Sequence, residues 1–83
     1  MKNTPKKLVK KEVLAYYGRC RYTYIDQDKN SYTVKVYNRY YDRLYDEGNF
    51  IYIFKVYINP EPSIENGYSY KCGEEIDRYL VNS

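Results

Sequence analysis

The chain has 83 residues, with 14 tyrosines, two phenylalanines and neither tryptophan nor histidine. Its formal net charge is +3 and it contains two cysteines. This length allows one small domain with a thin core, and the lack of histidine excludes every site that depends on imidazole. Tyrosine rings must therefore enter the core, and each brings a hydroxyl group that needs a polar partner.

The positive charge is concentrated at the start of the chain. Residues 1–12 contain five lysines against one glutamate, whereas residues 13–83 contain nine basic and ten acidic side chains. Such a start is typical of a solvated, frayed terminus, and we expect residues 1–5 to be disordered. The functional alternative is a short arm that contacts phosphates or an acidic surface.

The sequence predicts neither a signal peptide nor a membrane span. Lys10 and Lys11 interrupt the first apolar residues, and no apolar run reaches the length of a bilayer. We therefore expect a soluble cytoplasmic protein with no membrane partner, in the host cytoplasm if a phage encodes it. Cys20 and Cys72 could form a disulfide, but two free thiols are expected in a reducing compartment, and the sequence leaves this open.

A helix is predicted near the N-terminus. Thr4 is a suitable N-cap, Pro5 suits a first turn, and Gly18 is a suitable stop. Between them apolar residues recur at helical spacing, which predicts a helix over residues 6–17. In the alternative, residues 13–17 already belong to a strand, because β-branched and aromatic residues are dense there.

Segments with the alternation of β-strands follow the predicted helix. They cover residues 19–25, 32–41 and 50–58, with polar turns between them, and residues 68–72 form a short fourth candidate. Residues 73–81 resemble a short helix, because acidic residues come first and apolar ones share one face. The predicted fold is a single α+β domain over residues 1–83, in two layers. An antiparallel meander of three to four strands is combined with an N-terminal helix and a short C-terminal helix.

Strand alternation divides this sheet into two chemically different faces. The apolar face is expected to pack against Val9, Val13, Ile76 and Leu80. The opposite face collects six basic residues together with tyrosines, and no acid, since the acidic residues fall in turns and near the C-terminus. Its candidate partner-binding residues are Arg19, Arg21, Lys35, Tyr37, Arg39, Tyr41, Arg43, Lys55 and Tyr57.

Two interpretations of this basic face remain open. In the functional one, Lys and Arg neutralise an anionic macromolecule while Tyr rings stack or fill pockets. In the structural one, a solvated sheet face simply carries long amphipathic side chains that cover exposed rings. A bulge near residues 38–42 would move part of the stripe to the other face.

Enzyme chemistry, cofactors and metals find little support in the sequence. Two cysteines without histidine do not make a standard zinc site, and no glycine-rich phosphate loop occurs. Residues 26–30 resemble the start of a calcium loop, but Ser31 and Tyr37 replace the required glycine and glutamate, so we predict a hairpin turn. The chain is predicted to be no enzyme and to bind neither cofactor nor metal.

Three hypotheses follow for the function. The first is a small non-catalytic inhibitor or adaptor, of the anti-defence kind that phages and mobile elements use, docking on a protein with an acidic or nucleic-acid-binding surface. The second is a direct binder of single-stranded nucleic acid or RNA, with bases stacked on Tyr37 and Tyr41. The third is a structural homodimer formed through exposed Ile51, Ile53 and Tyr57.

Overall fold

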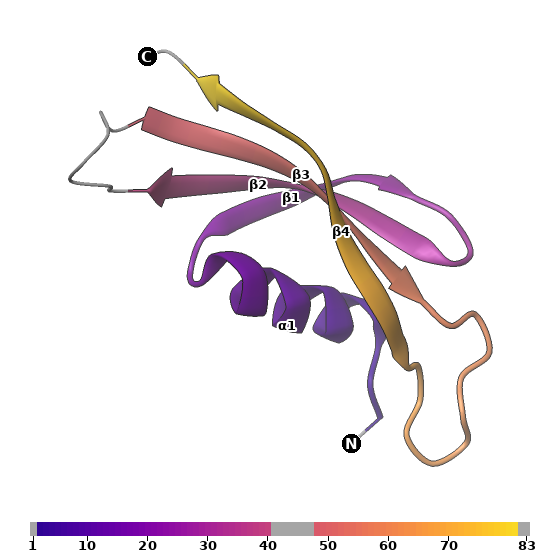
Figure 1. Ribbon diagram of the computed structural model, residues 1–83. Helices are drawn as coiled ribbons and strands as arrows, with labels where there is room; N and C mark the ends of the chain where they lie inside the picture. The colour runs from indigo at the N-terminus through magenta and orange to yellow at the C-terminus, as the bar shows by residue number, and fades with distance from the viewer. Residues whose placement is uncertain (1, 41–47, 82–83) are drawn as a thin grey trace.

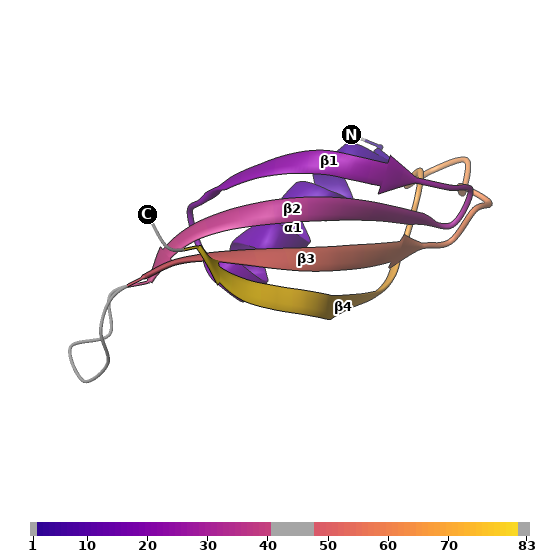
Figure 2. The ribbon, with the colours of Figure 1, turned by 90° about the horizontal axis from the view of Figure 1, so that it is seen from above.

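A computed structural model of the chain describes residues 2–40 and 48–81. In chain order its elements are α1 (Pro5–Tyr17), β1 (Arg21–Gln27), β2 (Ser31–Tyr40), β3 (Gly48–Ile58) and β4 (Tyr70–Val81). The four strands form one sheet in the order β1-β2-β3-β4, and every neighbouring pair is antiparallel. Helix α1 lies against one face of this twisted sheet (Figures 1 and 2). The predicted α+β, two-layer architecture is confirmed.

The helix begins and ends at the residues that the sequence indicated. The Thr4 side chain accepts a hydrogen bond from the Lys7 backbone N–H at 3.3 Å, which satisfies one of the free donors of the first turn. Gly18 ends the helix with φ of 73°, a conformation that suits glycine, and its N–H donates to the Leu14 carbonyl at 2.9 Å. Residues 13–17 are helical, so the strand alternative is wrong.

The N-terminal segment differs from the expectation of disorder, because Asn3 pairs with the loop before β4. The Asn3 N–H donates to the Asn66 carbonyl at 2.8 Å, and the Tyr68 N–H donates to the Asn3 carbonyl at 2.9 Å. Gly67 has φ of 75°, and a Cβ atom there would lie 2.5 Å from the Asn3 oxygen. In Figure 1 the described segment before α1 accordingly lies beside the loop that joins β3 to β4.

The core is one layer of side chains between α1 and the sheet. It contains Leu8, Val9, Val13, Val34, Val36, Phe54, Val56 and Ile58. Each such side chain contributes about 1.5–3 kcal/mol when it is fully buried. Tyrosines extend the layer as expected: the Tyr16 ring centroid lies 4.8 Å from that of Phe54, and the Tyr17 centroid lies 4.7 Å from that of Tyr52.

The predicted C-terminal helix is wrong, because residues 70–81 form β4. Ile53 pairs with Asp77 and Phe54 with Glu75, so Ile76 is an extra, bulged residue. The extra residue interrupts the two-residue alternation of side chains along the strand. The apolar residues of this segment therefore recur at a spacing typical of a helix. Ile76 and Leu80 are consequently about half exposed rather than packed in the core.

Candidate functional site

The sheet face opposite α1, hereafter the outer face, is defined by the strand register. Residues directly opposite each other on paired strands share a face, and Val34, Val36 and Phe54 point toward α1. Three rows cross the outer face from β1 to β4: Arg21–Tyr37–Ile51–Tyr79, Thr23–Lys35–Ile53–Asp77 and Asp26–Thr33–Lys55–Glu74. None of the described helices and strands covers this face, which is turned toward the viewer in Figure 2.

The structure brings together part of the predicted basic, Tyr-rich stripe. The predicted residues on the outer face are Arg21, Lys35, Tyr37, Lys55 and Tyr57. Arg19 lies before the start of β1, in the connection from α1, and is not part of the sheet. Arg39 pairs in register with Asn49, and Tyr41 and Arg43 lie outside the described residues.

The expectation that the outer face lacks acidic residues is wrong. Because residues 70–81 form a strand, Glu74 and Asp77 stand opposite Lys55 and Ile53. Asp26 reaches the same face because the register of β1 shifts by one residue between Tyr24 and Asp26. The described outer face therefore has three basic and three acidic residues in its rows, with Arg21 and Lys35 on β1 and β2 and the acids Glu74 and Asp77 on β4.

Lysine side chains lie over tyrosine rings on the outer face. Lys35 Nζ is 5.6 Å from the centre of the Tyr37 ring, and Lys55 Nζ is 5.2 Å from that of Tyr57. The Tyr57 hydroxyl also donates to Glu74 Oε2 at 3.4 Å, across to β4. These contacts hold the rings in place, as the structural interpretation of the stripe expected.

Among the described residues, the most accessible aromatic groups on the outer face are Tyr37 and Tyr79, with exposures of 40% and 41%. They flank Ile51 in their row, and Ile51 is only 8% exposed although no described element lies above it. The assumption of an exposed Ile51 in the homodimer hypothesis is therefore wrong. Sequence reasoning missed Tyr79 because it placed this residue on a helix.

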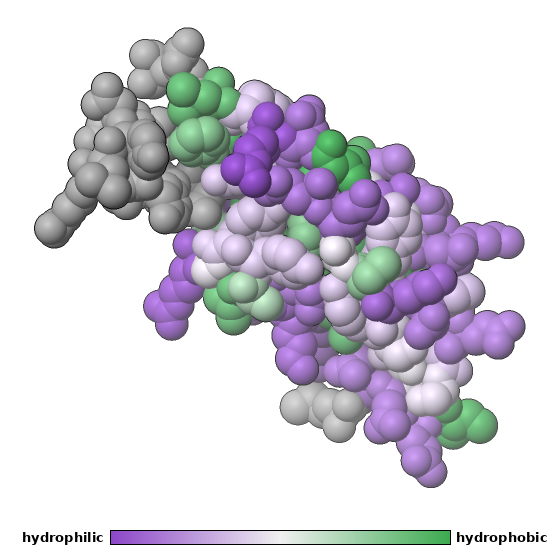
Figure 3. Space-filling model, in the orientation of Figure 1, coloured by the Kyte–Doolittle hydropathy of each residue, from purple (hydrophilic) through white to green (hydrophobic). Residues whose placement is uncertain are grey.

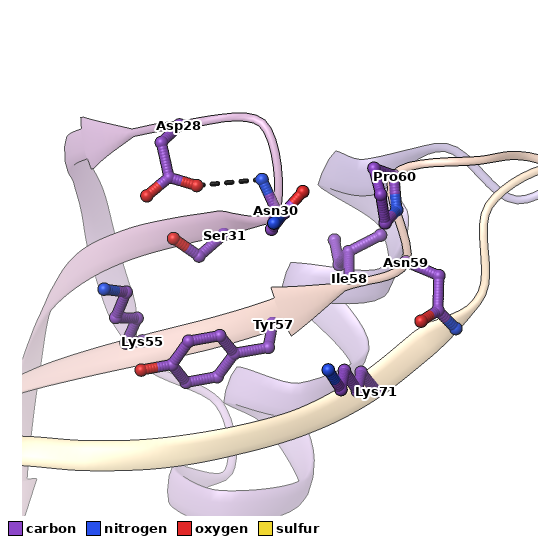
Figure 4. Close-up of a pocket in the computed structure, with 9 residues that line it drawn as sticks. All are labelled: Asp28, Asn30, Ser31, Lys55, Tyr57, Ile58, Asn59, Pro60 and Lys71. Atoms are coloured by element: carbon purple, nitrogen blue, oxygen red, sulfur yellow. Dashed lines mark hydrogen bonds between the residues drawn. The ribbon is translucent and has the colours of Figure 1, made fainter.

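A pocket of about 220 Å³ lies at the end of the sheet, beside the β1–β2 turn (Figure 4). Lys55 and Lys71 contribute positive charge to its lining, and Asp28 contributes negative charge. The Asp28 carboxylate accepts a hydrogen bond from the Asn30 N–H at 2.8 Å, and this bond is the main cause that lowers the pKa of Asp28. The backbone of the turn thus provides a hydrogen bond for the Asp28 carboxylate. The segment is a hairpin turn, as predicted.

Polar contacts on the other face connect α1 to β4. The Tyr17 hydroxyl donates to Glu75 Oε1 at 2.9 Å, and Arg78 forms a salt bridge of 3.0 Å with Glu75 Oε2. Burial, followed by the hydrogen bond to Glu75, raises the pKa of Tyr17. Burial and a hydrogen bond to Glu12 likewise raise the pKa of Tyr70. This network positions the helix on the sheet.

The two cysteines are free, and they lie at opposite sides of the sheet. Cys20 immediately precedes β1, and Cys72 belongs to β4, the other edge strand. Burial raises the pKa of the Cys20 thiol. Within residues 2–40 and 48–81, no three acidic or cysteine side chains gather as metal ligands, and no helix has the length and apolarity to cross a membrane.

Comparisons with known proteins return no match: no family model, no curated protein and no solved structure is similar to this chain. The surface of the molecule is therefore the basis for the function proposed below. In the view of Figure 3 most of the visible surface is hydrophilic, and apolar residues form small separate spots.

Proposed function

We propose that this protein is a non-catalytic binding protein whose outer face docks on another protein. One observation carries the proposal: the uncovered face presents two partly exposed tyrosine rings around a buried isoleucine, with Arg21 and Lys35 on one side and Glu74 and Asp77 on the other. Tyrosine is enriched among residues that dominate binding energy at protein interfaces. The Tyr37 ring, which Lys35 contacts, also loses little conformational freedom on binding.

The charge pattern favours a protein over a nucleic acid at this face. A phosphate backbone would meet Glu74 and Asp77 as well as Arg21 and Lys35, and the three acidic residues in the rows offset the three basic ones. A folded protein can instead place acidic groups against Arg21 and Lys35 and basic groups against Glu74 and Asp77. Such opposed charges fix the orientation of a partner.

The two free thiols support a cytoplasmic setting for this interaction. Cys20 and Cys72 lie near opposite edges of the sheet and are unpaired, which fits a reducing compartment. The partner class that we propose is accordingly a cytoplasmic protein, of the kind that a small inhibitor or adaptor would regulate.

Competition between variants tests the docking face. The tagged wild-type protein is used to capture partners from a lysate of its own cells, with untagged variants as competitors. We expect the untagged wild-type protein and the Leu14→Ala variant to compete equally for the captured partner, because Leu14 is exposed on α1, away from the outer face. The variant Tyr37→Ala/Tyr79→Ala is expected to compete at least about tenfold less well. Equal competition by this variant, with an unchanged circular dichroism spectrum, would exclude the outer face.

Self-association is a second candidate, and the sorted charges favour it. A two-fold axis parallel to the strands, between β2 and β3, would place β1 and β2 of one copy against β4 and β3 of the other. Lys35 would then lie beside the partner's Asp77, and Arg21 would face the partner's Tyr79. Two of the three rows are thus complementary across the axis, whereas the third places Asp26 opposite the partner's Glu74.

A charge swap tests this candidate by sedimentation equilibrium. Lys35→Asp and Asp77→Lys should each abolish the dimer, because like charges then meet twice across the axis. An equimolar mixture of the two variants should restore it, because both contacts become favourable in the mixed dimer. A wild-type protein that stays monomeric at high micromolar concentration excludes self-association, whereas the docking of another protein is judged by the competition experiment.

A further inference from the structure

The outward side of α1 carries a second charged surface, on the layer opposite the outer face. Lys7, Lys10 and Lys11 are exposed there, and we call them the lysine face of α1. At 3.6 residues per turn these three lie on one side of the helix, while Val9 and Val13 point into the core. Lys6 lies at the border, with its Nζ 5.6 Å from the centre of the Tyr24 ring.

This arrangement of charge opposes the local preferences of a helix. Lys6 and Lys7 occupy the first turn, where the helix dipole disfavours positive charge, and that turn contains no acidic residue. Lys7 also has like-charged neighbours three and four residues later, which repel it. Departures from local helix preferences are expected at functional sites. The unfavourable charges of the lysine face are therefore consistent with a functional role.

Within the part of the chain that the structure describes, little neutralises the charges of Lys6, Lys10 and Lys11. Glu12 is the one acidic residue of α1, and it is engaged by the hydrogen bond with Tyr70. Lys6, Lys10 and Lys11 form no salt bridge with any described residue, and the salt bridge between Arg78 and Glu75 lies on β4. The charges of these three exposed lysines are therefore directed into the solvent.

We propose that the lysine face of α1 binds the phosphate backbone of nucleic acid without reading its sequence. Lysine ammonium groups are compact point charges that suit a uniform row of phosphates. They lack the planar guanidinium group with which arginine binds a carboxylate or phosphate in a bidentate manner. Insertion into a lipid surface does not fit, because Val9 and Val13 on the apolar side of α1 are buried against the sheet.

The two surfaces lie on opposite layers of the domain, with α1 on one side of the sheet and the outer face on the other (Figures 1 and 2). Nucleic acid on α1 would leave Tyr37 and Tyr79 accessible to a protein. The domain can therefore bridge a nucleic acid and a protein. The proposal for α1 does not depend on the proposed function of the outer face, and each can fail without the other.

Fluorescence anisotropy with a short labelled DNA duplex, over a series of salt concentrations, tests the proposal. The wild-type protein is expected to bind at low salt, with an affinity that falls linearly on a logarithmic salt scale. In Lys7→Gln/Lys10→Gln/Lys11→Gln the slope should decrease by about 2.7, because three phosphate contacts are lost. The matched control Arg21→Gln/Lys35→Gln/Lys55→Gln removes the same charge from the outer face, and it should retain most of the wild-type slope.

Thermal unfolding supplies an independent readout on the same variants. Glutamine has nearly the helix propensity of lysine, so the α1 variant should unfold at an equal or slightly higher temperature, because repulsion along the helix is removed. Loss of DNA binding without loss of stability supports the proposal. Absence of wild-type binding at low salt overturns it, as does equal loss of binding in the two triple variants. Binding of phosphatidylserine vesicles in place of DNA also overturns it.

Discussion

The hydroxyl of Tyr17, in the last turn of α1, donates a hydrogen bond of 2.9 Å to the Glu75 carboxylate on β4. This bond joins residues 58 positions apart and connects the helix to an edge strand of the sheet. Arg78 holds the same carboxylate from the other oxygen, and its guanidinium lies 5.8 Å from the centre of the Tyr52 ring. The docking of α1 thus depends on a polar contact as well as on apolar packing.

Tyr17→Phe should lower the free energy of unfolding by about 1 kcal/mol, because a hydrogen bond to a carboxylate is lost while the ring remains. Urea denaturation followed by circular dichroism measures the change. Tyr79→Phe is the matched control, since its side chain lies on the outer face, and we expect a change of only a few tenths of a kcal/mol. Equal effects of the two substitutions would show that the bond to Glu75 does not stabilise the fold.

Stability should decline in alkali, because partial burial raises the pKa of three tyrosines. The pKa of Tyr24 is raised to about 12, and those of Tyr17 and Tyr70 are also raised. The unfolded chain loses these protons first, near pH 10, so it binds fewer protons than the folded chain above that pH. For Tyr24, the contribution of this pKa shift to the free energy of unfolding is therefore complete below about pH 10. It is lost between about pH 10 and 12.

Urea midpoints measured from neutral pH upward test this dependence. The variant Tyr24→Phe should show a shallower decline than the wild-type protein, because one titrating group with a raised pKa is removed. A midpoint that stays constant beyond pH 10 would mean that these phenols are as accessible in the folded chain as in the unfolded one.

Gly73→Ala should destabilise the protein by about 1–3 kcal/mol through overpacking. A Cβ atom at this position would lie 2.7 Å from Phe54 Cζ and 3.0 Å from the Tyr70 hydroxyl oxygen. The cost should shrink when Phe54→Leu is also present, because the ring that blocks the Cβ atom is gone. If Gly73→Ala costs the same in both backgrounds, the close approach of β4 to Phe54 is not the cause.

The two thiols should react at very different rates with a disulfide reagent. Cys72 is exposed, whereas Cys20 is partly buried and burial raises its pKa, so less of its reactive thiolate is present at neutral pH. Cys72→Ser should abolish the fast phase and Cys20→Ser the slow one. A reductant should leave the unfolding temperature unchanged, and a marked decrease would instead reveal a disulfide.

The helix and the meander could be predicted because local signals and packing agree there. Thr4, Pro5 and Gly18 mark the ends of α1, and alternation in β2 and β3 matches one face buried under that helix. The last strand could not be predicted in the same way. The bulge at Ile76 interrupts the two-residue alternation of apolar side chains, so their spacing resembles that of a helix. Only the pairing with β3 decides between a strand and a helix.

The same bulge explains why the candidate site was predicted only in part. Arg21, Lys35, Tyr37, Lys55 and Tyr57 were placed on one face because β1, β2 and β3 alternate regularly through these residues. The acidic residues of β4 were assigned to a helix terminus, so their position opposite Lys55 and Ile53 was not foreseen. Shifts of register by one residue, at Ile25 and Ile76, therefore bring acidic residues into the described rows of a face that was expected to be basic.

The central claim, that the outer face docks on another protein, is tested most directly by site-specific photo-crosslinking. Tyr37 is replaced with p-benzoylphenylalanine, which keeps an aromatic side chain on the outer face, and Leu14 is replaced likewise as the control on α1. We predict a discrete protein adduct from position 37 that Tyr79→Ala diminishes, and no such adduct from position 14. The absence of an adduct at position 37, or equal adducts at both positions, would contradict the claim.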